Sequence, residues 1–152
     1  MTKLVVKTKI EAPPEVCFDL ARDIGLHCQT VRHTKERATA GVTSGLIELG
    51  QWVTFEAVHF GFRQRLTAKI TEFDRPRCFV DEMIEGAFVS LRHVHGFISL
   101  QGGTLMRDTL IWKSPFGVFG TLIDQVFLRR YMRRFLIERN TNLKRIAEAK
   151  SQ

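Results

Sequence analysis

The chain has 152 residues, of which 44% are hydrophobic and 26% are charged, and its formal net charge is +7. This composition is ordinary for a globular protein and excludes a disordered or fibrous chain. The chain is also long enough to form a sizeable core. We therefore expect one domain over residues 1–152.

The positive charge is concentrated near the C-terminus. From Val126 to Gln152, eight lysines and arginines stand against two glutamates, which leaves +6 of the +7 in this segment. No RNP-type, zinc-finger or KH signature accompanies these arginines, so nucleic acid is not an expected partner. The simplest interpretation is the solvated face of a helix, and the alternative is attraction to an anionic membrane surface or an acidic partner. The arginines concerned are Arg129, Arg130, Arg133 and Arg134.

The cysteines and the lengths of the apolar runs indicate the cellular compartment to expect. Cys17, Cys28 and Cys78 are odd in number and lack CxxC spacing, which argues against a disulfide framework and against a cysteine zinc site. No apolar run approaches the roughly 20 residues of a membrane-spanning helix, and the N-terminal segment lacks the apolar stretch of a signal peptide. We expect a cytoplasmic protein.

The elements follow in chain order. Residues 3–11 alternate as a first strand, and "APPEVCFDLARD" then predicts a helix with proline in its first turn. A second short helix is expected at residues 24–29. Residues 32–113 break into short β-rich runs separated by glycines, which is typical of an antiparallel meander.

After "KSPFG", residues 120–149 predict one long helix, because they contain no proline and no glycine beyond Gly120. Between Val118 and Phe127 apolar residues occur almost all round, so we expect this front half to be buried. From Leu128 onward a single apolar stripe opposes the basic residues, which predicts a half-buried rear half.

Two predicted hairpins show which side chains share a face. A Phe60-Gly61 turn pairs His59 with Phe62, and a Gly102-Gly103 turn pairs Gln101 with Thr104. The second register would place His95 opposite Leu110, with Asp108 diagonal to His95 and within side-chain reach.

Alternation then gives one inner face that is apolar apart from a few polar side chains. A buried polar group must be hydrogen-bonded or costs about 1–3 kcal/mol. Two explanations stay open, a wet cavity lined by these groups and a structural polar cluster within a solid core. The predicted cavity residues are Phe55, Ala57, His59, Phe62, Gln64, Leu66, Leu91, His93, His95, Phe97, Met106, Asp108, Leu110 and Trp112.

The stretch "LRHVHGF" suggests chemistry for His93 and His95. Two histidines at i and i+2 with Asp108 nearby could bind a metal, but strand alternation makes this spacing common by chance. His59 is expected about three strands away, or roughly 14 Å at ~4.8 Å per strand. We therefore expect neither a metal nor another cofactor. A hydrolytic triad lacks its signature, whereas His95 with Asp108, or His93, could act as general acid and base.

The segments "IEAPPEVCFDLARDIGLH", "LGQWVTFEAVHFGFRQRLTAKITEFDRPRCFVDEMIEGAF", "RHVHGF" and "GTLMRDTLIWKSPFGVFG" resemble a bacterial branch of the START-like, or SRPBCC, superfamily. This superfamily also contains polyketide cyclase/dehydrase and Bet v 1-like proteins, and the likeness covers nearly the whole chain. It implies an α+β helix-grip fold, in which a curved antiparallel sheet of about seven strands wraps around a long C-terminal helix, with two short helices after the first strand.

The resemblance also implies a hydrophobic cavity between sheet and helix for a lipid, polyketide or isoprenoid-like molecule. The branch's VTW-x-A-x-HFG pattern falls on residues 53–61, where Phe55 replaces the tryptophan and implies a wider cavity or a different stacking partner. Its H-x-H-x-F and D positions fall on His93, His95 and Asp108. A shared fold does not identify a reaction. Three functions therefore stay open, namely a carrier or sensor, a cyclase/aromatase- or hydratase-like enzyme, and a peripheral membrane or partner-binding protein.

Overall fold

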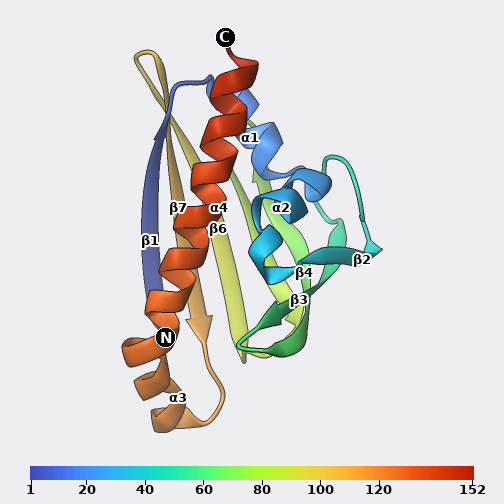
Figure 1. The fold of residues 1–152 in the computed structure, drawn as a ribbon, viewed down its shortest axis with the longest axis vertical. Helices are drawn as coiled ribbons and strands as arrows, with labels where there is room; N and C mark the ends of the chain where they lie inside the picture. Colours follow the sequence, from blue (N-terminus) through green and yellow to red (C-terminus); the bar gives the residue numbers. More distant parts are fainter.

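In the computed structural model, which describes residues 1–152, a seven-stranded antiparallel sheet curves around one long C-terminal helix (Figure 1). The strands are β1 (Thr2–Ile10), β2 (Arg37–Gly41), β3 (Trp52–His59), β4 (Phe62–Asp74), β5 (Cys78–Glu85), β6 (Ser90–Leu100) and β7 (Gly103–Lys113). The helices are α1 (Pro14–Ala21), α2 (Ile24–Thr30), the short 3₁₀ helix η1 (Arg32–Thr34), α3 (Gly117–Ile123), the π-helical turn η2 (Asp124–Leu128) and α4 (Arg129–Lys150).

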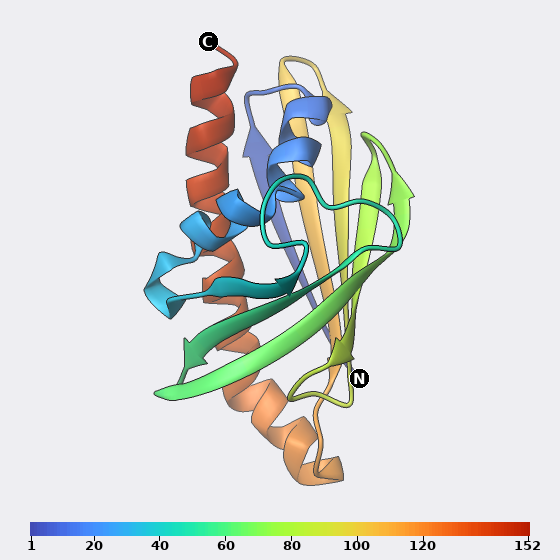
Figure 2. The same ribbon diagram turned by 90° about the vertical axis from the view of Figure 1, so that its right-hand side faces the viewer.

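The strand order is β1-β7-β6-β5-β4-β3-β2, so the meander from β2 to β7 is followed by β1 at the far edge. Figure 2 shows the sheet bending around α4, with α1 and α2 covering one end of the concave side. This arrangement confirms the predicted helix-grip fold, including the two short helices after the first strand.

The β3–β4 hairpin has the predicted register, with His59 opposite Phe62 and Phe55 opposite Leu66. Its two turn residues, Phe60 and Gly61, have φ angles of 55° and 78°. Positive φ at both central residues is what a type I′ turn requires, and such a turn follows the twist of the strands it joins.

The β6–β7 hairpin differs from the predicted register by two residues. Leu100 pairs with Gly103, so the turn consists of Gln101 and Gly102, and His95 lies opposite Asp108 instead of Leu110. Gly103 is the first residue of β7 and packs against the end of β1, where a Cβ would collide with the carbonyl of Ile10. A shift of two keeps every side chain on its predicted face.

An aromatic cluster attaches α1 to the sheet. Phe18 is fully buried, and its ring makes edge contacts with Phe73, Phe79 and Phe97 at centroid separations of 5.2–5.3 Å. Pro14 at the first turn suits the start of this helix, because its missing N–H would have no partner there. The cluster closes one end of the space between sheet and α4.

The front half of the C-terminal helix contradicts its prediction. Val118, Phe119, Leu122 and Val126 are each more than 60% exposed, although we expected this segment to be buried. The reason is visible in Figures 1 and 2, where α3 projects beyond the end of the sheet and no strand covers it. The rear half in α4 has the expected buried stripe, which includes Leu136 and Leu143.

None of the helices combines the length and the hydropathy that crossing a membrane requires.

Two phenylalanines test this description of the core. We expect Phe18→Ala to lower the free energy of unfolding by about 3–5 kcal/mol, because it empties a fully buried site. We expect Phe119→Ala to change it by less than about 0.5 kcal/mol, since this ring is 77% exposed. Chemical denaturation of both variants beside the wild type measures the difference, and equal losses would contradict the exposed position of α3.

Candidate functional site

A cavity of about 220 Å³ lies between the sheet and α4. Twenty of its 30 lining residues are hydrophobic, so its walls are mainly apolar. The apolar wall from the sheet includes Val53, Phe55, Ala57, Leu66, Ala68, Ile70, Phe79, Leu91 and Leu110, and the wall from the helix includes Leu128, Met132, Phe135 and Leu136.

Most of the residues predicted to line a cavity do line this one. They are Phe55, Ala57, His59, Gln64, Leu66, Leu91, His93, His95 and Leu110. Phe97, Met106 and Trp112 are instead packed in the core, and Asp108 is completely buried behind the cavity wall. Phe62 begins β4 at the tip of the hairpin and is 71% exposed, so it lies outside the cavity.

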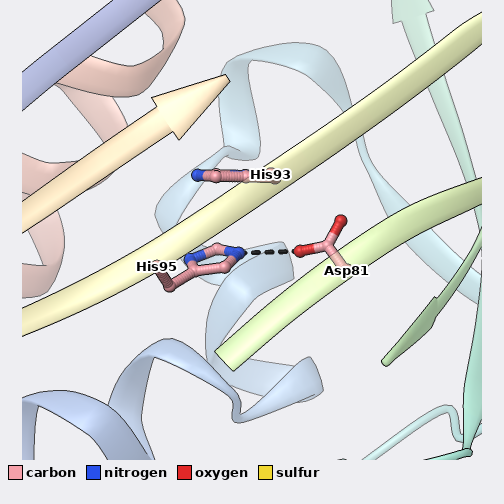
Figure 3. Close-up of side chains that lie close together, drawn as sticks. All are labelled: Asp81, His93 and His95. Atoms are coloured by element: carbon pink, nitrogen blue, oxygen red, sulfur yellow. Dashed lines mark hydrogen bonds and ion pairs between the residues drawn. The ribbon is translucent and has the colours of Figure 1, made fainter. Parts of the chain in front are cut away.

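Two histidines and two carboxylates form a polar cluster on three neighbouring strands, and we call Asp81, His93, His95 and Asp108 the Asp–His cluster. Each imidazole on β6 bonds the carboxylate that lies diagonally across from it, not the one directly opposite. His95 Nε2 is 2.7 Å from Asp81 Oδ2 on β5, and His93 Nε2 is 2.8 Å from Asp108 Oδ1 on β7. Figure 3 shows the first of these bonds and the two rings lying over one another. The expected contact of His95 with Asp108 is present only as a longer one, with 3.5 Å between His95 Nδ1 and Asp108 Oδ1, and the shorter bond to Asp108 comes from His93.

Asp108 is also bonded from the helix side. Arg139 Nη1 donates to its Oδ1 at 3.2 Å, and Asn140 Nδ2 donates to its Oδ2 at 2.7 Å. Burial alone would raise the pKa of Asp108, but the hydrogen bond from His93 and the charge of Arg139 outweigh it and hold the pKa well below its ordinary value. The carboxylate is therefore ionised and connects β7, β6 and α4.

His95 occupies the centre of a stack of rings. Its imidazole lies between the Phe79 ring, at a centroid separation of 4.1 Å, and the His93 ring, at 3.7 Å. Burial, followed by the electrostatic interaction with His93, lowers the pKa of His95 to about 4. His95 is therefore neutral at pH 7, and its Nε2–H donates to Asp81.

Asp81 is the ionised partner of that bond. Burial acts to raise its pKa, yet the hydrogen bond and charge of His95 lower it overall. Asp81, His93 and His95 also place one metal-ligating atom each within 4.8 Å of the others. Asp81, and not Asp108, would thus complete a two-histidine, one-carboxylate set. The 2.7 Å bond between His95 and Asp81 occupies two of the atoms that a metal would need.

A second polar group lines a different wall of the cavity. His27 Nε2 lies 3.0 Å from Glu36 Oε2, and His59 Nδ1 shares a short hydrogen bond with the hydroxyl of Tyr131 on α4. Burial lowers the pKa of His59 and raises that of Tyr131. As expected from the strand order, β3 and therefore His59 lie three strands from β6.

Sequence reasoning missed several of these side chains, although two of them left a signal. Asp81 has the same strand parity as Phe79, whose large apolar side chain predicts an inward face. Arg139 lies three residues after Leu136 and four before Leu143, so it falls in the apolar stripe of the helix. No comparable pattern marked Glu36 as a residue of the cavity wall.

The lowered pKa of His95 predicts a pH-dependent stability. The unfolded chain takes up a proton on His95 near pH 6.5, whereas the folded chain does so only near pH 4. The unfolded state therefore binds more protons in this window, so the contribution of His95 is complete above pH 6.5 and is lost as the pH falls towards 4. At about 1.4 kcal/mol per pKa unit, the loss is on the order of 3 kcal/mol.

Urea unfolding of the wild type and of His95→Gln between pH 4 and pH 7 measures this contribution as a difference in slope. The variant should lose less stability on acidification, whatever its stability at pH 7. His33→Gln is the matched control, because that imidazole is 38% exposed and lies outside the cluster. Parallel pH profiles for wild type and His95→Gln would show that His95 does not resist protonation.

Comparison with known proteins identifies the fold and goes no further. No protein-family model matches the chain, and no curated protein sequence matches it. Among solved structures, TTHA0849 from Thermus thermophilus superposes with a TM-score of 0.80 at 20% identity, over 99% of this chain and 100% of that one. The ginseng major latex-like protein 151 from Panax ginseng gives 0.73 at 13% identity, over 96% and 97% of the two chains. Protein Ms6760 from Mycobacterium smegmatis gives 0.71 at 18%, over 97% and 92%. The chain therefore has the helix-grip fold that Bet v 1-like proteins share.

Proposed function

We propose that the protein binds a small, mainly apolar molecule in the cavity between the sheet and α4, as a carrier or sensor. The observation that carries this proposal is the cavity itself, about 220 Å³ in volume with two thirds of its lining residues hydrophobic and a polar cluster at one wall. Ligand sites typically combine apolar walls with a few placed polar groups.

The volume limits the size of the occupant. An apolar cavity of about 150 Å³ accommodates benzene, and sites for drug-sized molecules begin at about 300 Å³. The present cavity lies between these values, so it suits a molecule of one or two rings, or part of a longer isoprenoid or polyketide chain. It is too small to enclose a complete two-chain lipid.

The charges at the Asp–His cluster limit the polar group of the ligand. Arg139 compensates one carboxylate, Asp108, and donates to it directly. Asp81, in contrast, is bonded by His95, which is neutral at pH 7, and forms no ion pair with a lysine or an arginine. A ligand carboxylate would be buried beside the charge of Asp81, which is costly, whereas a hydroxyl could donate a hydrogen bond to it. We therefore propose a phenol- or alcohol-bearing apolar ligand.

Fluorescence titration with 2-naphthol tests the site. We expect the wild type to bind 2-naphthol and to bind 2-naphthoate at least roughly tenfold more weakly, because of Asp81. Ala57→Phe should abolish 2-naphthol binding, since Ala57 is buried in the cavity wall and a phenyl group there fills the space. Ala149→Phe, at an exposed position on α4, is the control for the added ring.

Native mass spectrometry of protein purified from its own host extends this test to the natural ligand. A retained mass that Ala57→Phe lacks would identify the chemical class. Unchanged 2-naphthol binding in Ala57→Phe would contradict a ligand in this cavity, and equal binding of the carboxylate would contradict the predicted polar group.

One observation favours a second function, acid–base catalysis on a bound polyketide-like or unsaturated molecule. His93 lines the cavity, its Nε2 bonds Asp108, and its Nδ1 has no hydrogen-bond partner in the protein. A histidine oriented by a buried carboxylate, with its second nitrogen free, can move a proton to or from a bound substrate. This assigns the catalytic role to His93, where the sequence had favoured His95.

Cyclisation of a poly-β-ketone thioester, followed by chromatography, tests this second function. We expect His93→Gln to lower the rate by roughly 100-fold or more while 2-naphthol still binds, because general acid–base catalysis contributes at least that much. His33→Gln should leave the rate unchanged. An active His93→Gln variant, or an inactive wild type, would leave ligand binding as the better proposal.

A further inference from the structure

The start of the C-terminal helix carries an apolar surface that nothing in the chain covers. Seven large hydrophobic side chains in and just before this segment are each more than half exposed, and we call them the apolar tip. They are Phe116, Val118, Phe119, Leu122, Ile123, Val126 and Phe127. Isolated exposed hydrophobic residues are common, but a contiguous group of this kind marks an interaction site.

The fold holds this segment away from the sheet. The buried carboxylate of Asp124 accepts hydrogen bonds from Ser114 at 2.5 Å and from Thr2 at 3.3 Å, which fixes the helix to β1 and to the end of β7. Gly120 lies so close to the carbonyl of Pro115 that a Cβ would collide with it. Only this narrow side of the helix is buried, so the remaining sides of α3 face outward.

The next two turns add positive charge. Arg129, Arg130, Arg133 and Arg134 follow the apolar tip directly, and no acidic side chain of the protein forms an ion pair with any of them. Lys113 precedes the tip and is exposed. The apolar side chains are thus flanked by cations that the chain leaves uncompensated.

We propose that the apolar tip inserts into the interface of a membrane with anionic lipids, with the arginines of α4 at the level of the headgroups. Aromatic and aliphatic side chains beside lysines and arginines are the composition of peripheral membrane anchors. Each cation near such a surface adds about fivefold to its affinity for anionic lipid. Charge also disfavours a second copy as the occupant, because two identical tips would bring their arginines together without compensation.

The position of the tip gives membrane binding a use. The Phe127 ring contacts the Phe60 ring at 5.2 Å, and Phe60 is both half-exposed and part of the cavity wall. A tip inserted in lipid therefore places the rim of the cavity at the membrane surface. An apolar ligand could then pass between bilayer and cavity without crossing water. This last step rests on the proposed ligand binding, whereas membrane binding itself does not.

Vesicle flotation tests the proposal with the full chain. We expect the wild type to float with vesicles of phosphatidylcholine and phosphatidylglycerol, and to bind phosphatidylcholine alone at least tenfold more weakly. Phe119→Ser combined with Leu122→Ser should lower binding to the mixed vesicles by tenfold or more. Arg130→Glu combined with Arg133→Glu should remove the preference for phosphatidylglycerol and the sensitivity of binding to salt.

Matched controls lie on β6 near the β6–β7 hairpin, at the opposite end of the molecule from α3 (Figure 1). Ile98→Ser combined with Leu100→Ser removes exposed apolar side chains there and should leave vesicle binding unchanged. The 2-naphthol titration, run on the same variants, separates a failure of membrane binding from a failure of ligand binding. Absence of wild-type flotation, or equal flotation of the Phe119 and Leu122 double variant, would overturn the proposal. A dimer that this double variant dissociates, with no vesicle binding, would assign the tip to self-association instead.

Discussion

A single buried carboxylate joins the sheet to the helix that it grips. Asp108 receives His93 from the neighbouring strand and both Arg139 and Asn140 from α4. Removing one partner of such a network leaves a charge buried without compensation, which is far more costly than the net gain from forming the pair. The network therefore fixes how deeply α4 lies against the sheet and which of its side chains face inward. Because these polar bonds hold α4 against the sheet, the apolar side chains beside them need not fill the whole space between helix and sheet. A cavity can therefore remain there.

The sequence predicted the order of strands and helices well because those signals are periodic, whereas the helix-grip arrangement followed from the resemblance to the START-like superfamily. Strand alternation placed His93 and His95 on the inner face, and that result survived a hairpin register that was wrong by two residues, since side-chain orientation repeats every two. The hydrogen bonds between side chains depend on the register itself. The sequence therefore located the histidines and brought Asp108 near His95, but it missed Asp81 as the hydrogen-bond partner of His95 and His93 as that of Asp108.

Other features depend on neighbours that periodicity cannot reveal. An apolar run in a helix predicts burial only if another element is present to cover it, and α3 extends past the last residues of the sheet. The inward position of Arg139 is similarly unexpected for a charged residue, because its burial depends on Asp108, 31 residues earlier in the chain. The aromatic turn at Phe60 was predicted, but its contact with the helix depends on the curvature of the sheet.

The π-helical turn at Asp124–Leu128 has a geometric consequence for both ends of the helix. Successive residues of an α-helix are rotated by about 100°, and a π turn accommodates one residue more than an α turn does. Gly120 and Asp124, up to the first residue of this turn, form the buried side of the helix against Pro115, Ser114 and Thr2, and Leu136 and Arg139 form its buried side afterwards. In an uninterrupted α-helix of the same sequence the two sets would be out of phase by roughly that angle. The extra residue of the π turn rotates the following side chains about the helix axis. One helix can therefore be anchored at Asp124 and still direct Arg139 to the interior.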